Sequence, residues 1–282
     1  ILLFGADAMK ALFGKRATLD RTRSGVFFLR GVRGLGQIPE TFQATPEYGR
    51  DYGIKIYVTS HPAHILREVC LRESFVEDLR KFANLTSGKG VPCGSGEPDY
   101  LYVDSAKSLG ALVDILSESC TELAVDCEWG GEDPYKGKLR TIQFSWAAGQ
   151  ACVVILRAQG GADAQDDVER MEMYELLRKL FCKKGMKLIG HNFRADAKWL
   201  EWLGIPVKQN FYFDTMLADH VLNENAEHGL ESCSVRYTTM GRYDWSMSKW
   251  LSDNKYNKKK LKALGFMDVP DEIFLKYAAS DP

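Results

Sequence analysis

Two carboxylates two residues apart, in the run ELAVDCEWGG, are the feature of this sequence that carries the most chemistry. Asp126 and Glu128 follow an apolar stretch typical of a buried strand. Successive side chains of a strand point to opposite faces, so the two acids share one face, roughly 7 Å apart, while Val125 and Cys127 point to the other. Such a pair is electrostatically costly unless a cation lies between the acids. Ligands that are all oxygen favour Mg²⁺ or Mn²⁺, so the pair predicts a divalent metal site.

Three further patterns can join this pair. In LIGHNFRADAKWL, Asn192 and Asp196 lie four residues apart, where a strand is expected to run into a helix. In FDTMLADHVLN, Asp214 occupies a helix N-cap position. In FLKYAASD, Tyr277 and Asp281 are four residues apart on a helix, so the hydroxyl and the carboxylate share a face. The chain therefore presents D-x-E, N-x-x-x-D and Y-x-x-x-D in that order.

The surrounding sequence predicts the elements that must position these side chains. A strand and a helix open the second part of the chain, and three strand-like runs then suit an antiparallel meander. A helix, a strand and a helix follow, and we expect the chain from 213 to 282 to be mostly helical. These elements fall in the runs 100–119, 122–130, 139–146, 151–157, 168–181, 186–192 and 194–204. Leading strands followed by alternation predict a mixed α/β unit.

The run TSGKGVPCGSGEP, at residues 86–98, is rich in Gly, Ser and Pro and predicts a linker. We therefore divide the chain into a first domain at 1–85 and a second at 99–282. In the first, ILLFG predicts a strand, ADAMKALFG a helix, IKIYVTSHPAHIL a strand and a short helix, and ESFVEDLRKFANL an amphipathic helix. This basic first part before an acid-rich second part fits a phosphate-binding region beside a metal site, or equally two ordinary solvated surfaces.

The composition excludes several classes of protein. A chain of 282 residues with 45% hydrophobic residues can bury two cores. Its seven cysteines are odd in number and none is spaced C-x-x-C, which indicates a reducing compartment without disulfides, zinc or iron–sulfur clusters. No apolar run approaches the ~18 residues of a membrane span, and the opening residues are a poor signal peptide. The chain begins without Met, and we expect it to be a fragment of a longer protein.

The order of the acidic patterns resembles the DEDD family of 3′–5′ exonucleases, in the branch that contains a tyrosine. The runs LIGHNFRADAKWLEWLGI, FDTMLADHVLN and YAASD are similar to the proofreading domain of family A DNA polymerases, over roughly residues 99–282. The resemblance implies an RNase H-like mixed sheet flanked by helices. It also implies two Mg²⁺ or Mn²⁺ ions, release of nucleoside 5′-monophosphates from single-stranded or frayed DNA 3′ ends, and a polymerase domain that begins just after Pro282.

The same resemblance implies a role for each acid. Asp126 holds both ions, Glu128 and Asp281 complete the site of the ion nearest the nucleophile, and Asp196 serves the leaving-group side. Tyr277 orients the attacking water, because a free tyrosine with a pKa of about 10 is a poor base at neutral pH.

Four other residues are candidates near this site. Asn192 contacts the substrate strand in the family that the chain resembles. Trp129 and Phe193 could stack on terminal bases, although such residues belong more often to a core. We expect Asp214 to cap and orient the chain, and we leave it out of the catalytic set.

The first domain also resembles a known family. LLFGADAMKALFG, RSG at 23–25, IYVTSHPAHILRE and FVEDLRKF resemble the C-terminal half of a uracil-DNA glycosylase-like domain of α/β type. In active members, the residue matching His61 contacts the flipped uracil and stabilises its developing anion. The family's Gly-rich first motif would lie upstream of this sequence, so we expect the segment itself to be a structural or DNA-guiding module, as in bacteriophage-type polymerases. This resemblance implies a cytoplasmic location in a bacterial cell or a phage-infected host.

Two alternatives stay open from the sequence. An RNA-processing exonuclease of the RNase D type carries the same acids, and the glycosylase-like first domain favours DNA over that alternative. A non-catalytic DNA-binding module with uracil-DNA glycosylase-like recognition is the other, and the presence of all four acids and the tyrosine argues against it.

Overall fold

The chain was studied as a computed structural model, which describes residues 1–13, 26–28, 55–68, 71–87, 99–156, 166–238 and 243–282, with single residues at 15, 19, 23 and 240. These residues form two compact units. The first contains residues 1–98 and 229–245, and the second contains residues 99–228 and 246–282. Most of the expected linker at 86–98, and most of the RSG run at 23–25, lie outside the described residues.

The first unit is built on a small mixed sheet with the strand order β1-β3-β2. β1 (Leu2–Phe4) pairs in parallel with β3 (Lys55–Thr59), and β2 (Val26–Phe28) pairs antiparallel with β3. The helices of this unit are α1 (Gly5–Phe13), α3 (Pro62–Arg67), α4 (Arg72–Thr86) and α9 (Leu230–Tyr237). The strands and helices expected in the first domain are therefore confirmed, and the unit is of α/β type.

A buried polar network joins α4 to β3. The Asp78 carboxylate accepts hydrogen bonds from the Thr59 hydroxyl at 2.6 Å and from Arg23 Nε at 2.7 Å. Lys81, one turn further along α4, donates to the backbone carbonyl of Thr238 at 3.0 Å. Burial lowers the pKa of the Lys81 ammonium to about 8. Residues around α9 are thus held to α4 by a hydrogen bond from a buried lysine.

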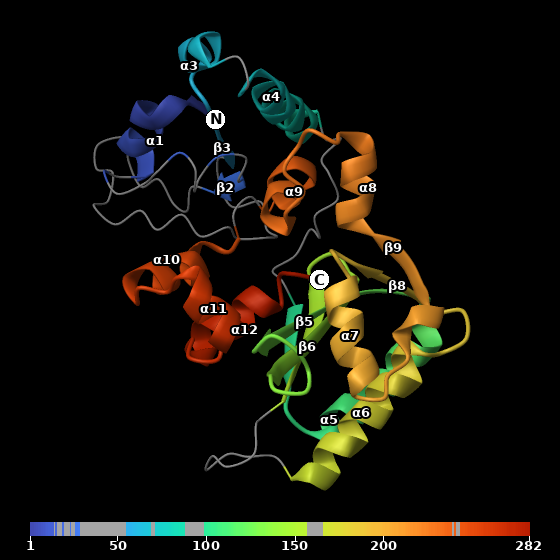
Figure 1. The fold of residues 1–282 in the computed structure, drawn as a ribbon. Coiled ribbons are helices and arrows are strands. Elements are labelled where there is room, and N and C mark those ends of the chain that lie inside the picture. Colours follow the sequence, from blue (N-terminus) through green and yellow to red (C-terminus); the bar gives the residue numbers. More distant parts are fainter. Residues whose placement is uncertain are drawn as a thin grey trace, which may run out of the picture. The chain divides into compact units, whose positions relative to one another are not determined.

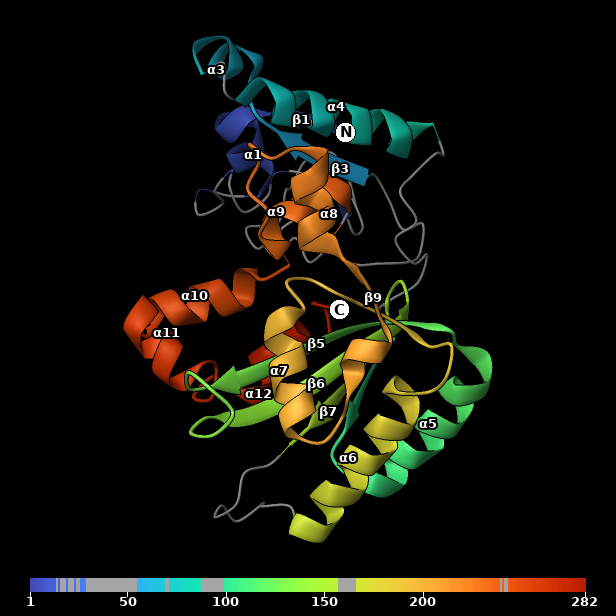
Figure 2. The same cartoon turned by 45° about the vertical axis from the view of Figure 1, so that its right-hand side comes forward.

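The second unit contains the sheet in which the acid pair lies (Figures 1 and 2). Its strands are β4 (Asp99–Val103), β5 (Glu122–Gly130), β6 (Lys138–Ala147), β7 (Gln150–Ile155), β8 (Lys187–Gly190) and β9 (Phe211–Asp214). Its helices are α5 (Ala106–Ser119), α6 (Asp167–Phe181), α7 (Arg194–Trp202), η2 (Val207–Gln209), α8 (Thr215–Leu222), α10 (Trp245–Asp253, of which Trp245 belongs to the first unit), α11 (Lys258–Leu264) and α12 (Asp271–Ala278).

Among the described residues the strand order is β4-β7-β6-β5-β8-β9. β5, β6 and β7 form the antiparallel meander that the sequence predicts, while β8 and β9 extend the sheet in parallel from β5. The expected mixed sheet flanked by helices is confirmed. β9 was not expected, because its run FYFD is too short to show a period of two.

The two faces of the sheet pack against different helices, as the alternation along β7 shows. Cys152 and Val154 belong to a core shared with α5, α6 and α7, whereas Val153 belongs to a core shared with α10 and α12. A strand that is buried on both faces reads as a continuous apolar run. On β5, Val125 and Cys127 face the first core, so the acid pair points to the opposite face.

No helix in the described part of the chain combines the length and the apolar character that crossing a membrane requires.

Gly265, directly after α11, lets the chain pass very close to β5. Its φ is +54°, and a Cβ atom added there would lie 1.8 Å from the carbonyl oxygen of Trp129. Both the left-handed backbone and the close approach to a strand therefore require glycine. The turn leads into α12, which carries Tyr277 and is followed by Asp281.

We predict that Gly265→Ala destabilises the fold far more than Gly185→Ala. Gly185 also has a positive φ, +86°, but nothing lies within 4 Å of the place that a Cβ atom would take there, so it reports only the backbone cost of about 1 kcal/mol. Gly265→Ala adds a backbone clash, and we expect a further loss of about 2 kcal/mol or more. Chemical unfolding of both variants measures the difference, and equal losses would refute the close approach.

Candidate active site

Three carboxylates meet at the face of β5 that points away from the α5–α7 core. Asp126 and Glu128 lie on the strand, and Asp281 lies three residues beyond the end of α12. One oxygen from each lies within 4.8 Å of the others. All three side chains are half-buried, and Figures 1 and 2 show the C-terminal end of the chain beside β5. The structure thus brings together residues more than 150 positions apart in the sequence.

The fourth predicted acid, Asp196, reaches the same strand from the first turn of α7. Its Oδ1 accepts a hydrogen bond from the backbone N–H of Cys127 at 3.0 Å. That N–H belongs to the residue between Asp126 and Glu128, so the buried Asp196 carboxylate is held next to the pair. All four acids of the predicted set therefore converge on β5.

Gln143, which the sequence interpretation overlooked, orients Asp126. It lies directly opposite Asp126 in the β5–β6 register, and its Nε2 donates to Asp126 Oδ2 at 2.5 Å. Gln143 is fully buried, and its Oε1 has no hydrogen-bond partner in the described part of the chain. A glutamine in the middle of the apolar run LRTIQFSW was the available signal, because a buried amide needs a partner.

The loop after β8 is fixed by Asp214, as expected of a capping residue. Its carboxylate accepts from the backbone N–H groups of Asn192 at 3.1 Å and Phe193 at 3.0 Å, and also from Met216 and Leu217 in the first turn of α8. The expected N-cap is therefore confirmed. Asn192 itself is exposed and has a φ of +56°, a left-handed backbone that asparagine tolerates better than most residues.

The aromatic candidates lie in or against the core. Phe193 is 2% exposed and its ring stacks on that of Phe211, with centroids 5.3 Å apart. Trp129 is half-buried, and its ring centroid lies 5.4 Å from that of Trp199. In this arrangement Phe193 cannot stack on a terminal base, and only part of Trp129 is open to a ligand.

His61 lies in the first unit, where it caps α3. Its side chain is exposed, and Nδ1 accepts a hydrogen bond from the backbone N–H of Ala63 at 3.1 Å. Nε2 is left as the nitrogen that a ligand would contact.

Arg140 anchors α12, the helix that carries Tyr277 and precedes Asp281. From β6, its guanidinium donates to the carbonyls of Phe266 and Val269 and pairs with Asp271 at the start of α12. It also lies 3.7 Å from the ring centroid of Phe274. Sequence reasoning overlooked this residue, because an arginine in a strand gives no sign of which distant segment it binds.

Tyr277 lies in the last turn of α12, half-buried and packed edge-to-face on Phe266, with ring centroids 5.5 Å apart. Tyr277 and Asp281 were expected to share a helix face. The helix ends at Ala278, so Asp281 lies in the segment that follows it.

Comparison with known proteins assigns this unit to a family. The family model for the 3′–5′ exonuclease of the DNA polymerase A type matches residues 100–282, about two thirds of the chain. The chain belongs to this 3′–5′ exonuclease family. A DNA polymerase of Escherichia phage T5 is 32% identical over 112 residues, which are 37% of this chain and 13% of the phage protein. DNA polymerase I of Borreliella burgdorferi is 25% identical over 139 residues, which are 49% of this chain and 14% of that protein.

Each of these matches spans about a seventh of the relative's length. Among solved structures, the catalytic core of RRP6 from Trypanosoma brucei has a TM-score of 0.38 and 21% identity, covering 64% of this chain and 42% of that one. The complex of Trypanosoma brucei RNase D with GMP has a TM-score of 0.48 and 14% identity, covering 65% of this chain and 54% of that one.

The carboxyl groups of this exonuclease site are strongly perturbed. Burial raises the pKa of Asp126 to about 7. Burial and the charge of Asp126 raise the pKa of Asp196 to about 9. Burial and then the charges of Asp126 and Asp281 raise the pKa of Glu128 well above its ordinary value. Exonucleases of this type use divalent metals, and a divalent cation bound among these carboxylates would favour their ionised forms.

We predict that Asp126→Asn stabilises the metal-free protein, and more so as the pH rises. The pKa of Asp126 is raised on folding, so its contribution is fully present below about pH 4 and is lost as the pH rises through about 7. Each unit of pKa shift corresponds to about 1.4 kcal/mol. Thermal unfolding in EDTA at about pH 5 and about pH 8 should show a clearly larger gain for the variant at the higher pH. A variant less stable than wild type at both values would contradict the perturbed carboxyl cluster.

We also predict that Arg140→Ala lowers nuclease activity on the order of 10²-fold, because α12 then no longer holds its acid and hydroxyl in place. Arg140→Lys should recover little, since an ammonium cannot reproduce several fork-shaped contacts. Arg178→Ala, which removes an exposed arginine paired with Glu175 on α6, is the matched control and should keep wild-type turnover. Turnover of labelled oligonucleotide is the measurement, and full activity of Arg140→Ala would refute the anchoring role.

Proposed function

We propose that this chain is a metal-dependent 3′–5′ exonuclease domain that removes nucleoside 5′-monophosphates from single-stranded or frayed DNA, as the proofreading part of a family A DNA polymerase. The observation that carries the proposal is the convergence of Asp126, Glu128, Asp196 and Asp281 on one strand, in a chain of this exonuclease family.

The residues fit a pair of divalent ions. The site offers carboxylate oxygens, the donors that Mg²⁺ and Mn²⁺ prefer, and leaves the buried Oε1 of Gln143 without a partner beside them. Asp126 would be shared between the two ions, Glu128 and Asp281 would complete one, and Asp196 would serve the other. Bound ions of this kind supply Lewis-acid chemistry, activating a water molecule and stabilising charge that develops on a phosphate.

The protein's own groups then position the reactants. The Tyr277 hydroxyl lies on a helix anchored by Arg140. It would form a hydrogen bond with the attacking water and so fix the direction from which the water attacks. The exposed side chain of Asn192, on a loop clamped by Asp214, would donate to the substrate strand. The hydrogen bond from Gln143 keeps the Asp126 carboxylate in one orientation throughout.

The choice of DNA rests on the relatives. The two curated relatives described above are DNA polymerases, one from a phage and one from a bacterium, which supports proofreading and a polymerase domain in the same protein. We extend the proposal to the first unit as a uracil-DNA glycosylase-like module that guides DNA. The exposed Nε2 of His61 is the group that would meet the nucleic acid there.

The test is digestion of 5′-labelled single-stranded DNA and RNA by the purified chain, with Mg²⁺ or with EDTA. We expect stepwise shortening from the 3′ end of DNA, release of mononucleotides, and no shortening in EDTA. Asp126→Ala should abolish the activity while the fold is kept. Asp114→Ala, which removes an exposed acid of α5 paired with Lys179, should act as wild type.

Three outcomes would count against the proposal. Activity that survives EDTA would exclude the metal-dependent mechanism, and full activity of Asp126→Ala would exclude this site. Preference for RNA would replace proofreading by RNA processing of the RNase D type.

A further inference from the structure

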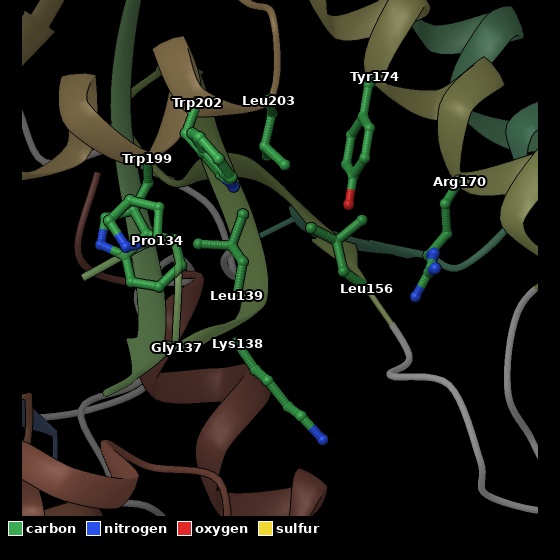
Figure 3. Close-up of a pocket in the computed structure, with 10 residues that line it drawn as sticks. All are labelled: Pro134, Gly137, Lys138, Leu139, Leu156, Arg170, Tyr174, Trp199, Trp202 and Leu203. Atoms are coloured by element: carbon green, nitrogen blue, oxygen red, sulfur yellow. The ribbon is translucent and has the colours of Figure 1, made fainter. Parts of the chain in front are cut away.

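A second concave site lies in the same unit. Neither the four acids nor the residues that hold them in place line it. It is a cavity of about 400 Å³ between the start of β6, the first half of α6 and the last turns of α7 (Figure 3). Aromatic rings from Tyr174, Trp199 and Trp202 line it, together with the charged side chains of Lys138 and Arg170. Among the described residues that line it, none is acidic.

Trp202 is the aromatic residue that the fold does not need for its core. It is 51% exposed, whereas Trp199, one turn earlier on α7, is 4% exposed and packs inward. Tyr135, which is 75% exposed, lies beside Trp202 with ring centroids 4.2 Å apart. Two large exposed rings side by side at the edge of a cavity form an apolar surface suited to a flat ligand.

The cations of the pocket suit an anionic group on that ligand. Lys138 is exposed, and no hydrogen bond or ion pair of its ammonium occurs in the described part of the chain. Arg170, which pairs with Asp167, is the second cation that lines the pocket. In Figure 3 the Tyr174 hydroxyl points into the cavity, Arg170 extends from the same helix as Tyr174, and Lys138 extends from the strand on the other side.

We propose that this pocket binds a nucleotide, with its base against Trp202 and its phosphate at Lys138 and Arg170. The cavity volume lies at the lower end of the range of about 300–1,000 Å³ that small-molecule sites occupy, which suits one nucleotide. Aromatic platforms flanked by cations are how proteins bind single nucleotides of a strand without regard to sequence. The nucleotide is either part of a nucleic-acid strand or free in solution. The choice between these two sources rests on the proposed function, whereas the pocket itself does not.

The pocket also has a physical connection to the acid site. Trp199 forms part of its wall, and the ring of Trp199 lies 5.4 Å from that of Trp129, the neighbour of Glu128. An occupant of the pocket would therefore contact Trp199, whose ring packs on Trp129 at the end of β5.

The experiment measures binding with EDTA present, so that metal-dependent cleavage does not interfere. The probes are AMP and a fluorescent single-stranded oligonucleotide, titrated against wild type, Trp202→Ala, Trp202→Phe and Lys138→Ala. Lys179→Ala is the matched control, because it removes an exposed lysine from α6 outside the pocket.

We expect Trp202→Ala to weaken binding by roughly 5- to 100-fold, the range that the loss of one stacked base gives. Trp202→Phe should keep most of the affinity, since a phenyl ring still stacks. Lys138→Ala should weaken binding and reduce its salt dependence by about one counterion. Lys179→Ala should bind as wild type.

Weakening of AMP binding by Trp202→Ala supports a site for free nucleotide, and weakening for the oligonucleotide alone supports a site for part of a strand. Unchanged binding of both probes in Trp202→Ala and in Lys138→Ala would overturn the inference. Binding in EDTA is measured independently of the nuclease reaction. If the chain degrades no nucleic acid with Mg²⁺ but still binds a probe in a Trp202-dependent way, the proposed function is wrong and the nucleotide pocket stands.

Discussion

Repulsion among four carboxyl groups at one end of a strand is the constraint on which the rest of this structure depends. Asp126 and Glu128 come from β5, while Asp196 and Asp281 arrive from α7 and from the segment after α12. As carboxylates they repel one another, and burial makes their ionised forms more costly. Asp126 and Asp196 are therefore held by N–H donors outside the acid set, from Gln143 and from the backbone of Cys127. Glu128 instead hydrogen-bonds to Asp281 within the set, and this bond raises the pKa of Glu128 further.

These holding contacts come from β5, from β6 and from the end of β9. Gln143 from β6 donates to Asp126, the strand backbone donates to Asp196, and Arg140 fixes the start of α12. Asp214 gathers the backbone N–H groups of the loop that leads into α7. The energy that these contacts contribute offsets the repulsion in the folded state. A cation that binds only the folded chain adds stability by mass action, so metal affinity and folding are linked here.

The sequence predicted best what depends on local periodicity. A period of two placed Asp126 and Glu128 on one face, and burial of Val125 and Cys127 on the other confirms it. The meander of β5, β6 and β7 and the cap at Asp214 also follow from residues close together in the chain.

What the sequence could not predict depends on partners far away in the chain. Nothing in the run around Arg140 indicates that it binds carbonyls more than 120 residues later. Phe193 was a candidate for stacking on a base, yet its ring packs on Phe211 of the unexpected strand β9 and so lies in the core. A short strand at the edge of a sheet gains its structure from the neighbouring strand rather than from its own four residues.

The segment 229–245 shows most clearly that a compact unit need not be one continuous stretch of the sequence. The family match runs without a break from 100 to 282, and the sequence-based domains are likewise contiguous. In the structure this segment groups with residues 1–98, and its backbone accepts a hydrogen bond from the buried Lys81 of α4. The chain leaves the second unit after His228 and re-enters it at Ser246. A cut near residue 98 would therefore separate α9 from the helix that it packs on, because the first unit is completed only by residues that follow most of the second in the sequence.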